Sequence, residues 1–370
     1  MCSTALHFVN DNFRVMQIAD IQEQYRTNPN TIRLMEAALD EAKPDLVILT
    51  GDQIKGYALD LIGGGREKVE AVIRNICRPM TDRGIAFTAT FGNHDAECGI
   101  SNSEQFEIYK TLPGFVWSEG PGQGDEGTFC LSVDDRVLIY LFDTHAKDGA
   151  GGFGTLHKNQ VEWYRQTRDS YEGKCGAPLP SFVFQHIPTP EFFEVLERSG
   201  RFSFGSVRAY GNFKNQWYKL DPHNVGSIRD FMGESPATSK INSGEVEAFL
   251  EKGEVKVLLA GHNHNDSFMA DYRGIKLGFT QGCSFSAYGP SLDRGVRYLD
   301  IKPDGSFESA TLTYGGLLGE LKELRWKYAL YEMAPVSIEG TKTFFKEAGM
   351  VLGTIGAAVG GALLLSKRKK

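Results

Sequence analysis

Five apolar runs of this chain each end in side chains of the kind that bind metal ions. The segments that follow these runs are, in order, Asp20-Ile21-Gln22, Gly51-Asp52-Gln53, Gly92-Asn93-His94-Asp95, Gln185-His186 and Gly261-His262-Asn263-His264. Short apolar runs of this length predict β-strands, and open α/β sheets build their sites at the carboxyl ends of strands. The order of the five segments therefore constrains both the fold and the chemistry.

The first part of the chain alternates between strand and helix patterns. Residues 13–19, 46–49 and 85–91 are short apolar runs, whereas residues 30–42 and 67–83 carry apolar side chains at helical spacing. Strand, helix, strand, helix, strand is the pattern of crossover connections in a parallel sheet. The sequence therefore predicts the α/β class.

The later part of the chain predicts further strands and a few helices. We expect a hairpin that turns at Asp134-Asp135, strands at 181–185, 255–260, 274–280, 296–301 and 306–313, and helices at 157–170, 245–252 and 317–331. Residues 201–243 have little periodicity and are rich in aromatic side chains, so we predict an insertion loop that shapes a substrate cleft. The glycine-rich stretch 149–154 lacks the strand-before, helix-after context of a nucleotide-binding loop and is interpreted as a plain loop.

The net charge of −7 excludes a broad nucleic-acid-binding surface but not a phosphorylated substrate. Metal ions can supply the local positive field that such a substrate needs. We therefore expect as partner a small-molecule phosphate ester or a phosphoprotein.

The carboxyl terminus has its own pattern. Residues 348–365 carry no charge, and Lys367, Arg368, Lys369 and Lys370 follow. Eighteen helical residues span roughly 27 Å, enough for a bilayer core. We divide the chain into a domain at 1–333, a linker at 334–347 and a membrane-associated or transmembrane tail at 348–370. The alternative is a glycine-rich tail that is flexible or packs on the domain. Because residues 1–10 show no secretory signal, we expect a location on the cytoplasmic side, tail-anchored to a membrane.

The polar segments together match the needs of a site with two metal ions. Asp52 can bridge two cations, Asp20 can add a terminal carboxylate, and Asn93 can ligate through its amide oxygen. The neutral imidazole ligands are His186, His262 and His264. His94 is then free to donate a proton to a leaving alkoxide, after a water activated between the metals attacks phosphorus. We expect Asp95 to hold the ring of His94 and raise its pKa.

These residues resemble the calcineurin-like metallophosphoesterase superfamily, whose ordered motifs are D-x-H, G-D, G-N-H-[DE], H and G-H-x-H. The resemblance spans about residues 13–264 and implies a four-layer α/β/β/α sandwich, followed here by a C-terminal hydrophobic helix. It also implies two divalent ions among Mn, Fe, Mg and Zn. The implied ligands are Asp20, Gln22, Asp52 and His264 for the first metal and Asp52, Asn93, His186 and His262 for the second, with His94 as proton donor.

Two positions depart from the family's patterns. Gln22 stands where the first motif usually has histidine, which implies a glutamine-variant branch with a weaker, more oxygen-loving first site, or a contact through water. Lys55 stands where the purple acid phosphatases, a branch of the superfamily, place a tyrosine ligand, which disfavours a ferric-tyrosinate centre.

Two functions of different classes follow from the resemblance. One is a dinuclear metal-dependent phosphatase or phosphodiesterase. The alternative is a non-catalytic protein that uses the same fold as a membrane-anchored binding or scaffold module. Every motif position except Gln22 keeps its expected residue type, which favours the enzyme.

Overall fold

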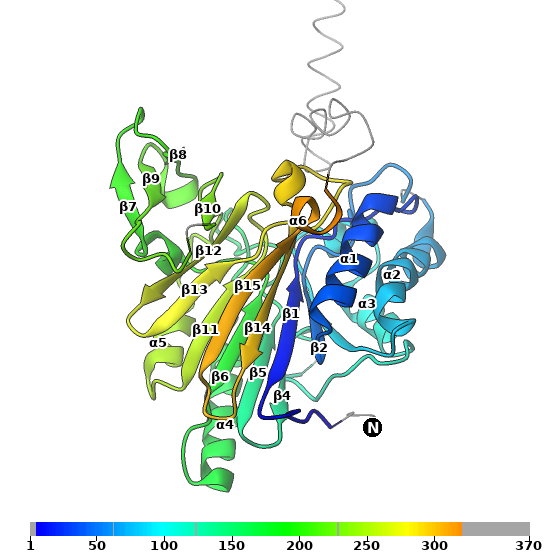
Figure 1. The fold of residues 1–370 in the computed structure, drawn as a ribbon, viewed down its shortest axis with the longest axis horizontal. Helices are drawn as coiled ribbons and strands as arrows, with labels where there is room; N and C mark the ends of the chain where they lie inside the picture. The colour runs from blue at the N-terminus through cyan, green and yellow to red at the C-terminus, as the bar shows by residue number, and fades with distance from the viewer. Residues whose placement is uncertain (1–4, 62, 123, 228, 320–370) are drawn as a thin grey trace, which may run out of the picture.

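The structure is a computed structural model that describes residues 5–61, 63–122, 124–227 and 229–319. Two mixed β-sheets face each other, and helices cover their outer faces (Figure 1). The predicted order of strands and helices in the first hundred residues is confirmed.

The first sheet has five strands in the order β15-β14-β1-β2-β3. Its strands are β1 (Phe13–Ile18), β2 (Leu46–Thr50), β3 (Ala86–Thr90), β14 (Gly295–Ile301) and β15 (Phe307–Thr313). β1, β2 and β3 run parallel, because helical crossovers connect them, and β14 pairs with β1 in antiparallel register. The outer face is covered by α1 (Pro29–Ala42), α2 (Gly65–Thr81) and α3 (Asn102–Tyr109) (Figure 1).

The second sheet has seven strands in the order β10-β12-β13-β11-β6-β5-β4. Its strands are β4 (Phe129–Val133), β5 (Val137–Phe142), β6 (Ser181–Gln185), β10 (Phe231–Met232), β11 (Val255–Ala260), β12 (Asp266–Tyr272) and β13 (Ile275–Phe279). The central strands β5, β6, β11 and β13 run parallel. Helices α4 (Lys158–Cys175) and α5 (Glu245–Leu250) pack on the outer face.

Alternate side chains of the second sheet enter two different hydrophobic cores. Ile139 and Leu141 of β5 belong to the core between the sheets, together with Leu49 of β2. Tyr140, between them, belongs to the outer core with Tyr164 of α4. A strand buried on both faces has no polar alternation, which is why these strands appear in the sequence as continuous apolar runs.

A small third sheet lies largely in the segment that was predicted to be an irregular insertion, with its first strand just before that segment. It consists of β7 (Leu196–Ser199), β9 (Trp217–Leu220) and β8 (Val207–Arg208), in that order. Phe213 and Tyr218 pack on Phe193, with ring centroids 4.1 and 5.0 Å from that ring, so these aromatics attach the segment to the body. The prediction of a loop without secondary structure is therefore wrong for this part.

Short single-turn elements complete the described chain: η1 (Asp95–Cys98), η2 (Pro190–Phe193), η3 (Gly211–Phe213), η4 (Ser291–Asp293) and α6 (Tyr314–Leu318). The predicted hairpin turn is confirmed, and Asp134 and Asp135 both take positive φ, at 52° and 50°. The sequence did not predict α3 or β12.

The predicted carboxyl-terminal elements fall largely beyond the described residues. Of the helix expected at 317–331, the structure shows only the end of α6. The linker at 334–347 and the hydrophobic helix at 348–370 lie outside the described residues. Within residues 5–319, apart from the three undescribed positions, no helix has the length and apolar character needed to cross a bilayer.

Candidate metal centre

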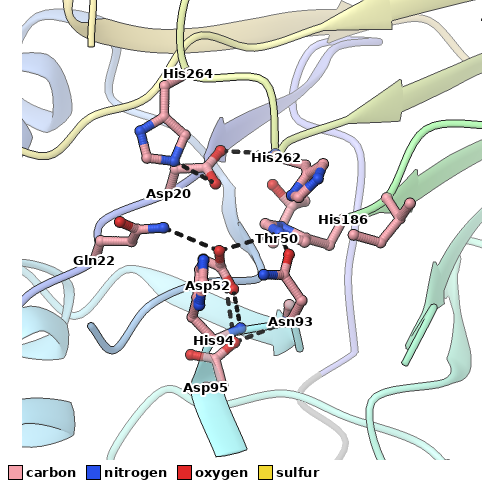
Figure 2. Close-up of polar contacts among 12 residues, drawn as sticks. Asp20, Gln22, Thr50, Asp52, Asn93, His94, Asp95, His186, His262 and His264 are labelled. Carbon is pink, nitrogen blue, oxygen red and sulfur yellow. Dashed lines mark hydrogen bonds and ion pairs between the residues drawn. The ribbon is translucent and has the colours of Figure 1, made fainter. Parts of the chain in front are cut away.

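The ends of five strands bring all the predicted metal-binding side chains to one place. Asp20 follows β1, Asp52 follows β2, and Asn93 follows β3 in the first sheet. His186 follows β6 in the second sheet, and His262 and His264 follow the neighbouring β11. Figure 2 shows these side chains gathered around Asp52. Ligand atoms of Asp52, His186 and His262 lie within 4.8 Å of one another.

The backbone is strained at four of these positions. Asp20, Gln22, Asp52 and His262 all have positive φ, at 53°, 35°, 49° and 69°. A non-glycine residue in this region costs on the order of 1–3 kcal/mol, and such residues gather at functional sites. Hydrogen bonds from Gln22 N to the Asp52 carbonyl (2.8 Å) and from His262 N to Asp20 Oδ2 (2.9 Å) help to hold these conformations.

Two glycines allow the strand ends to approach closely. A Cβ on Gly92 would lie 2.2 Å from Asp52 Oδ1, and one on Gly51 would lie 2.6 Å from His186 Nδ1. Both distances are shorter than any real contact. The glycines that precede Asp52 and Asn93 are therefore required by the packing of the site itself.

Asp95 supports the site through the backbone. Its buried carboxylate accepts hydrogen bonds from the backbone N–H of Asp52 (2.8 Å), Ile54 (2.9 Å) and Gly92 (2.7 Å). These bonds tie the end of β2 to the end of β3. The expectation that Asp95 holds the ring of His94 is wrong, because its carboxylate is directed to the backbone; Asp95 is a positioning residue.

The ring of His94 is held by two residues that the sequence analysis did not single out. Its Nδ1 lies 2.8 Å from Glu97 Oε2, and its ring meets the ring of Tyr57 edge-on at 4.8 Å. The backbone N–H of His94 donates to Asp52 Oδ1 at 2.8 Å. The only sequence signal for Glu97 was its position three residues after His94, which brings the two side chains to one side of a helical turn.

Two histidines are oriented with one ring nitrogen toward the centre. Nδ1 of His186 lies 2.9 Å from the Thr50 carbonyl, and Nδ1 of His264 lies 2.9 Å from the Tyr288 carbonyl. A carbonyl can only accept, so each Nδ1 carries a proton. In a neutral ring Nε2 is then the unprotonated nitrogen, which is the arrangement found in metal-binding histidines.

Each of these Nε2 atoms lies next to a carboxylate. His186 Nε2 is 3.3 Å from Asp52 Oδ2, and His264 Nε2 is 3.3 Å from Asp20 Oδ1. Asn93 Oδ1 lies 3.2 Å from His186 Nε2, so an amide oxygen joins the same group. The donors thus form two sets, one around Asp20 and one around Asp52.

Two buried polar atoms of the centre have no hydrogen-bond partner, and they test whether metal ions fit. These atoms are His262 Nε2 and Asp20 Oδ1; Asp20 Oδ1 has His264 Nε2 at 3.3 Å, a contact that is an ion pair only when that ring is protonated. Buried polar atoms in proteins nearly always have partners, so such a pair calls for an explanation. A carboxylate oxygen and an imidazole nitrogen are both ligands for divalent ions, and the residues present therefore fit a metal centre.

The electrostatics of the centre depend on its buried carboxylates. Burial opposes the charge on Asp52, but the charges of His186 and His94 outweigh it and hold the pKa of that carboxyl well below its usual range. Burial also opposes the charge on His186, but Asp52 outweighs it and raises the pKa of His186 to about 9. Burial, with the neighbouring His186 cation, lowers the pKa of His262, which stays neutral.

Gln22 contacts the centre through its amide nitrogen. Gln22 Nε2 donates to Asp52 Oδ2 at 3.0 Å, and the hydroxyl of Tyr57 donates to Gln22 Oε1 at 3.3 Å. In this arrangement Gln22 holds the carboxylate of Asp52, and its amide oxygen is used by Tyr57. Direct ligation by Gln22 stays a prediction.

A cavity of about 440 Å³ opens over the centre. Its floor contains Gln22, Asp52, Asn93, His94, His262 and His264, and its walls contain Glu97, Lys147, Phe153, Tyr210, Glu234, Ala237 and Tyr288. Tyr210, Glu234 and Ala237 come from the predicted insertion, so residues 201–243 do help to shape the cleft. Their position in the cavity wall was not visible in a sequence without periodicity.

A second cluster of metal-binding residue types lies outside this cavity. Ligand atoms of Asp125, His145 and His157 lie within 4.8 Å of one another. The two rings, however, stack with centroids 3.9 Å apart and planes 15° apart. An ion in the plane of one ring would lie out of the plane of the other, so this geometry does not suit a shared ligand. His145 Nε2 instead contacts Asp125 Oδ1 (3.3 Å) and Gln160 Oε1 (3.1 Å).

The chain belongs to the calcineurin-like phosphoesterase family, because the family model matches residues 13–266. A solved dimetal phosphatase from Danio rerio shares the fold, with a TM-score of 0.51 and 13% identity over 82% of this chain and 99% of that one. The expected superfamily and the α/β metallophosphoesterase fold are thus confirmed.

Two known proteins illustrate the range of relatives. A protein of Arabidopsis thaliana named "Probable inactive purple acid phosphatase 14" is 24% identical over 328 residues, which cover 77% of this chain and 74% of that protein. "Phosphatase DCR2" of Saccharomyces cerevisiae is 24% identical over 292 residues, which cover 70% of this chain and 45% of that protein. One name denies activity and the other states it, so kinship alone does not decide whether this chain is a catalyst.

Lys55 stands where the purple acid phosphatases place a tyrosine ligand. Its ammonium group donates a hydrogen bond to the Ser286 carbonyl at 2.7 Å.

The charge on His186 predicts a pH dependence of metal binding. Because its pKa is about 9 in the metal-free protein, an ion that takes its Nε2 must displace a proton at any pH below that value. We expect manganese affinity to rise by up to about tenfold per pH unit from pH 7 to 8.5, with about one proton released at this histidine. Calorimetry in buffers of different ionisation enthalpy measures that release, and a manganese affinity independent of pH over this range contradicts the prediction.

Gln22 generates a second prediction. Replacing Gln22 with histidine restores the family's usual imidazole and removes the hydrogen bond from Gln22 Nε2 to Asp52. We expect Gln22→His to strengthen manganese binding at the weaker of two sites by at least about tenfold, the low end of typical effects of groups around a metal. Calorimetric titration of chelator-treated protein checks this, with Gln53→His as the control at the neighbouring strand end. Unchanged affinity would show that position 22 does not contact the metal.

Proposed function

We propose that this protein is a dinuclear metal-dependent phosphoesterase that hydrolyses phosphate esters. The observation that carries the proposal is His262 Nε2, a buried ligand atom without a hydrogen-bond partner, beside two carboxylates that each lie 3.3 Å from a histidine nitrogen. Membership of the family and the cavity above these residues support the same conclusion.

The ligands divide into two sets around Asp52. Asp20 and His264 would hold one divalent ion, Asn93, His186 and His262 would hold the other, and Asp52 would serve both, with Gln22 oriented toward it. Ions of Mn, Fe, Mg or Zn bound there would make a water acidic enough to ionise near neutral pH and would neutralise phosphoryl oxygens.

His94 supplies the proton for the leaving oxygen. It lines the cavity, and its Nδ1 is held by Glu97, so its Nε2 is left as the second proton-carrying position. A carboxylate next to an imidazole fixes the tautomer and the orientation of the ring. Glu97 therefore acts here as the positioning residue, in the way that an acid orients a catalytic histidine in other hydrolases.

The rival function is a binding or scaffold protein with the same fold. The name of one relative as probably inactive favours it, whereas the contact of His94 Nδ1 with Glu97 Oε2 at 2.8 Å favours catalysis. A protein that only binds has no use for a held proton donor that ligates nothing.

The His94→Ala variant separates the two functions. Loss of a general acid lowers kcat by about 10²–10⁴, and we expect this drop for an alkyl phosphate such as glycerol phosphate with manganese, because an alkoxide needs a proton to leave. Glu97→Gln should lower kcat less and shift its pH profile. His223→Ala, at an exposed histidine, is the control. Equal rates in wild type and His94→Ala, or no turnover in the manganese-loaded wild type, would contradict the proposal.

A further inference from the structure

The glycine-rich loop at residues 147–154 forms one wall of the cavity. Lys147 and Phe153 form an antiparallel bridge at its base, and residues directly opposite each other in such a pair project to the same side. Both side chains line the cavity over the metal centre. The loop is therefore a small hairpin that presents a cation and an aromatic ring to whatever lies on the ligands.

The tip of this hairpin is fixed to the insertion by Asp148. Its Oδ1 accepts the N–H groups of Ala150 and Gly152, both at 2.8 Å. Its Oδ2 accepts the N–H of Lys240 at 2.8 Å and the hydroxyl of Ser239 at 3.1 Å. One carboxylate thus closes the turn and attaches it to the insertion at residues 239 and 240.

Two glycines are required for this arrangement. A Cβ on Gly152 would lie 2.7 Å from the backbone nitrogen of Lys240, and one on Gly154 would lie 2.1 Å from the carbonyl oxygens of Thr144 and His145. At the base, His145 is itself held by Gln160 and Asp125. Hydrogen bonds and ion pairs therefore fix both the tip and the base of the hairpin. Such preorganisation is typical of elements that bind a ligand.

The charges around the cavity give this hairpin a specific role. Among the described wall residues, Lys147 is the one cation, whereas Glu97 and Glu234 are acidic. Lys147 Nζ lies 5.0 Å from the ring centroid of Phe153, and that ring lies 4.3 Å from the ring of His262. The ammonium group is thus separated from a proposed metal ligand by a single aromatic ring.

We propose that residues 147–154 form a phosphoryl clamp, in which Lys147 binds the free oxygens of a dianionic phosphate monoester and Phe153 guides the lysine stem. The proposal rests on the proposed function of the same site. A monoester presents up to two negative charges on three free oxygens, whereas a diester presents one charge on two. The attraction to a nearby ammonium is correspondingly stronger for the monoester. Glu97 and Glu234 disfavour substrates with further anionic groups on those walls.

The test compares a monoester with a diester in the full-length, manganese-loaded protein. A hydrogen bond to a charged group is worth enough to change binding by about 10- to 100-fold. We expect Lys147→Met to lower kcat/KM for p-nitrophenyl phosphate by that factor and to change kcat/KM for bis(p-nitrophenyl) phosphate by less than about threefold. Lys147→Arg should keep most of the selectivity. Lys158→Met, at an exposed lysine at the start of α4, is the matched control.

Binding of inorganic phosphate gives a readout that does not depend on turnover. We expect Lys147→Met to weaken phosphate binding by about 10- to 100-fold, with melting temperature and metal content unchanged. If phosphate binding weakens but no ester is hydrolysed by the wild type, the clamp stands and the proposed catalytic function fails. If the wild type is active and Lys147→Met leaves phosphate affinity and the monoester-to-diester ratio unchanged, the clamp is overturned.

Discussion

A single buried carboxylate determines how the strand ends of this protein meet. Asp95 accepts three backbone N–H groups, from the ends of β2 and β3, and it is buried away from water. These bonds fix the turn that carries Asp52, and Asp52 in turn accepts the N–H of His94 and the amide of Gln22. Loss of this acceptor would leave buried donors without a partner, which costs about 1–3 kcal/mol for each donor. The position of Asp52 therefore depends on a residue that does not line the cavity.

The same geometry brings strained backbone conformations and buried charged side chains together in the centre. Four candidate ligands have left-handed backbone conformations, and two carboxylates lie beside histidine nitrogens at 3.3 Å. Neither feature stabilises a fold on its own, since strain costs energy and buried charges require compensation. Cations between the carboxylates and the imidazoles would compensate the buried charges and offset the cost of the strain. The fold then holds carboxylate and imidazole groups whose charges and hydrogen-bonding atoms are not fully compensated by one another.

Much of this site could be predicted from the sequence because strand ends are visible in it. Asp20, Asp52 and His186 each follow a continuous apolar run, so each is expected at the carboxyl end of a strand. Open α/β sheets build their sites at these ends, so the three residues are expected to lie close together. Roles that depend on three-dimensional contacts could not be predicted. Asp95 was assigned to the neighbouring ring, but its carboxylate reaches the backbone of another strand end.

Other parts of the site gave weaker signals in the sequence. Nothing in the sequence indicated a role for the glycine-rich loop. Its proposed role depends on the bridge between Lys147 and Phe153 and on the hydrogen bond from Lys240 N to Asp148, which only the structure shows. The short strands of the third sheet, two to four residues long, are too brief to show a period.

The central claim is that two cations lie between the carboxylates and the imidazoles. Anomalous diffraction from crystals of the manganese-loaded protein tests it most directly. We expect two peaks near Asp52, one beside Asp20 and His264 and the other beside Asn93, His186 and His262. Manganese-loaded crystals with no anomalous peak among these side chains, or with the imidazole of His262 still without a partner, would contradict it.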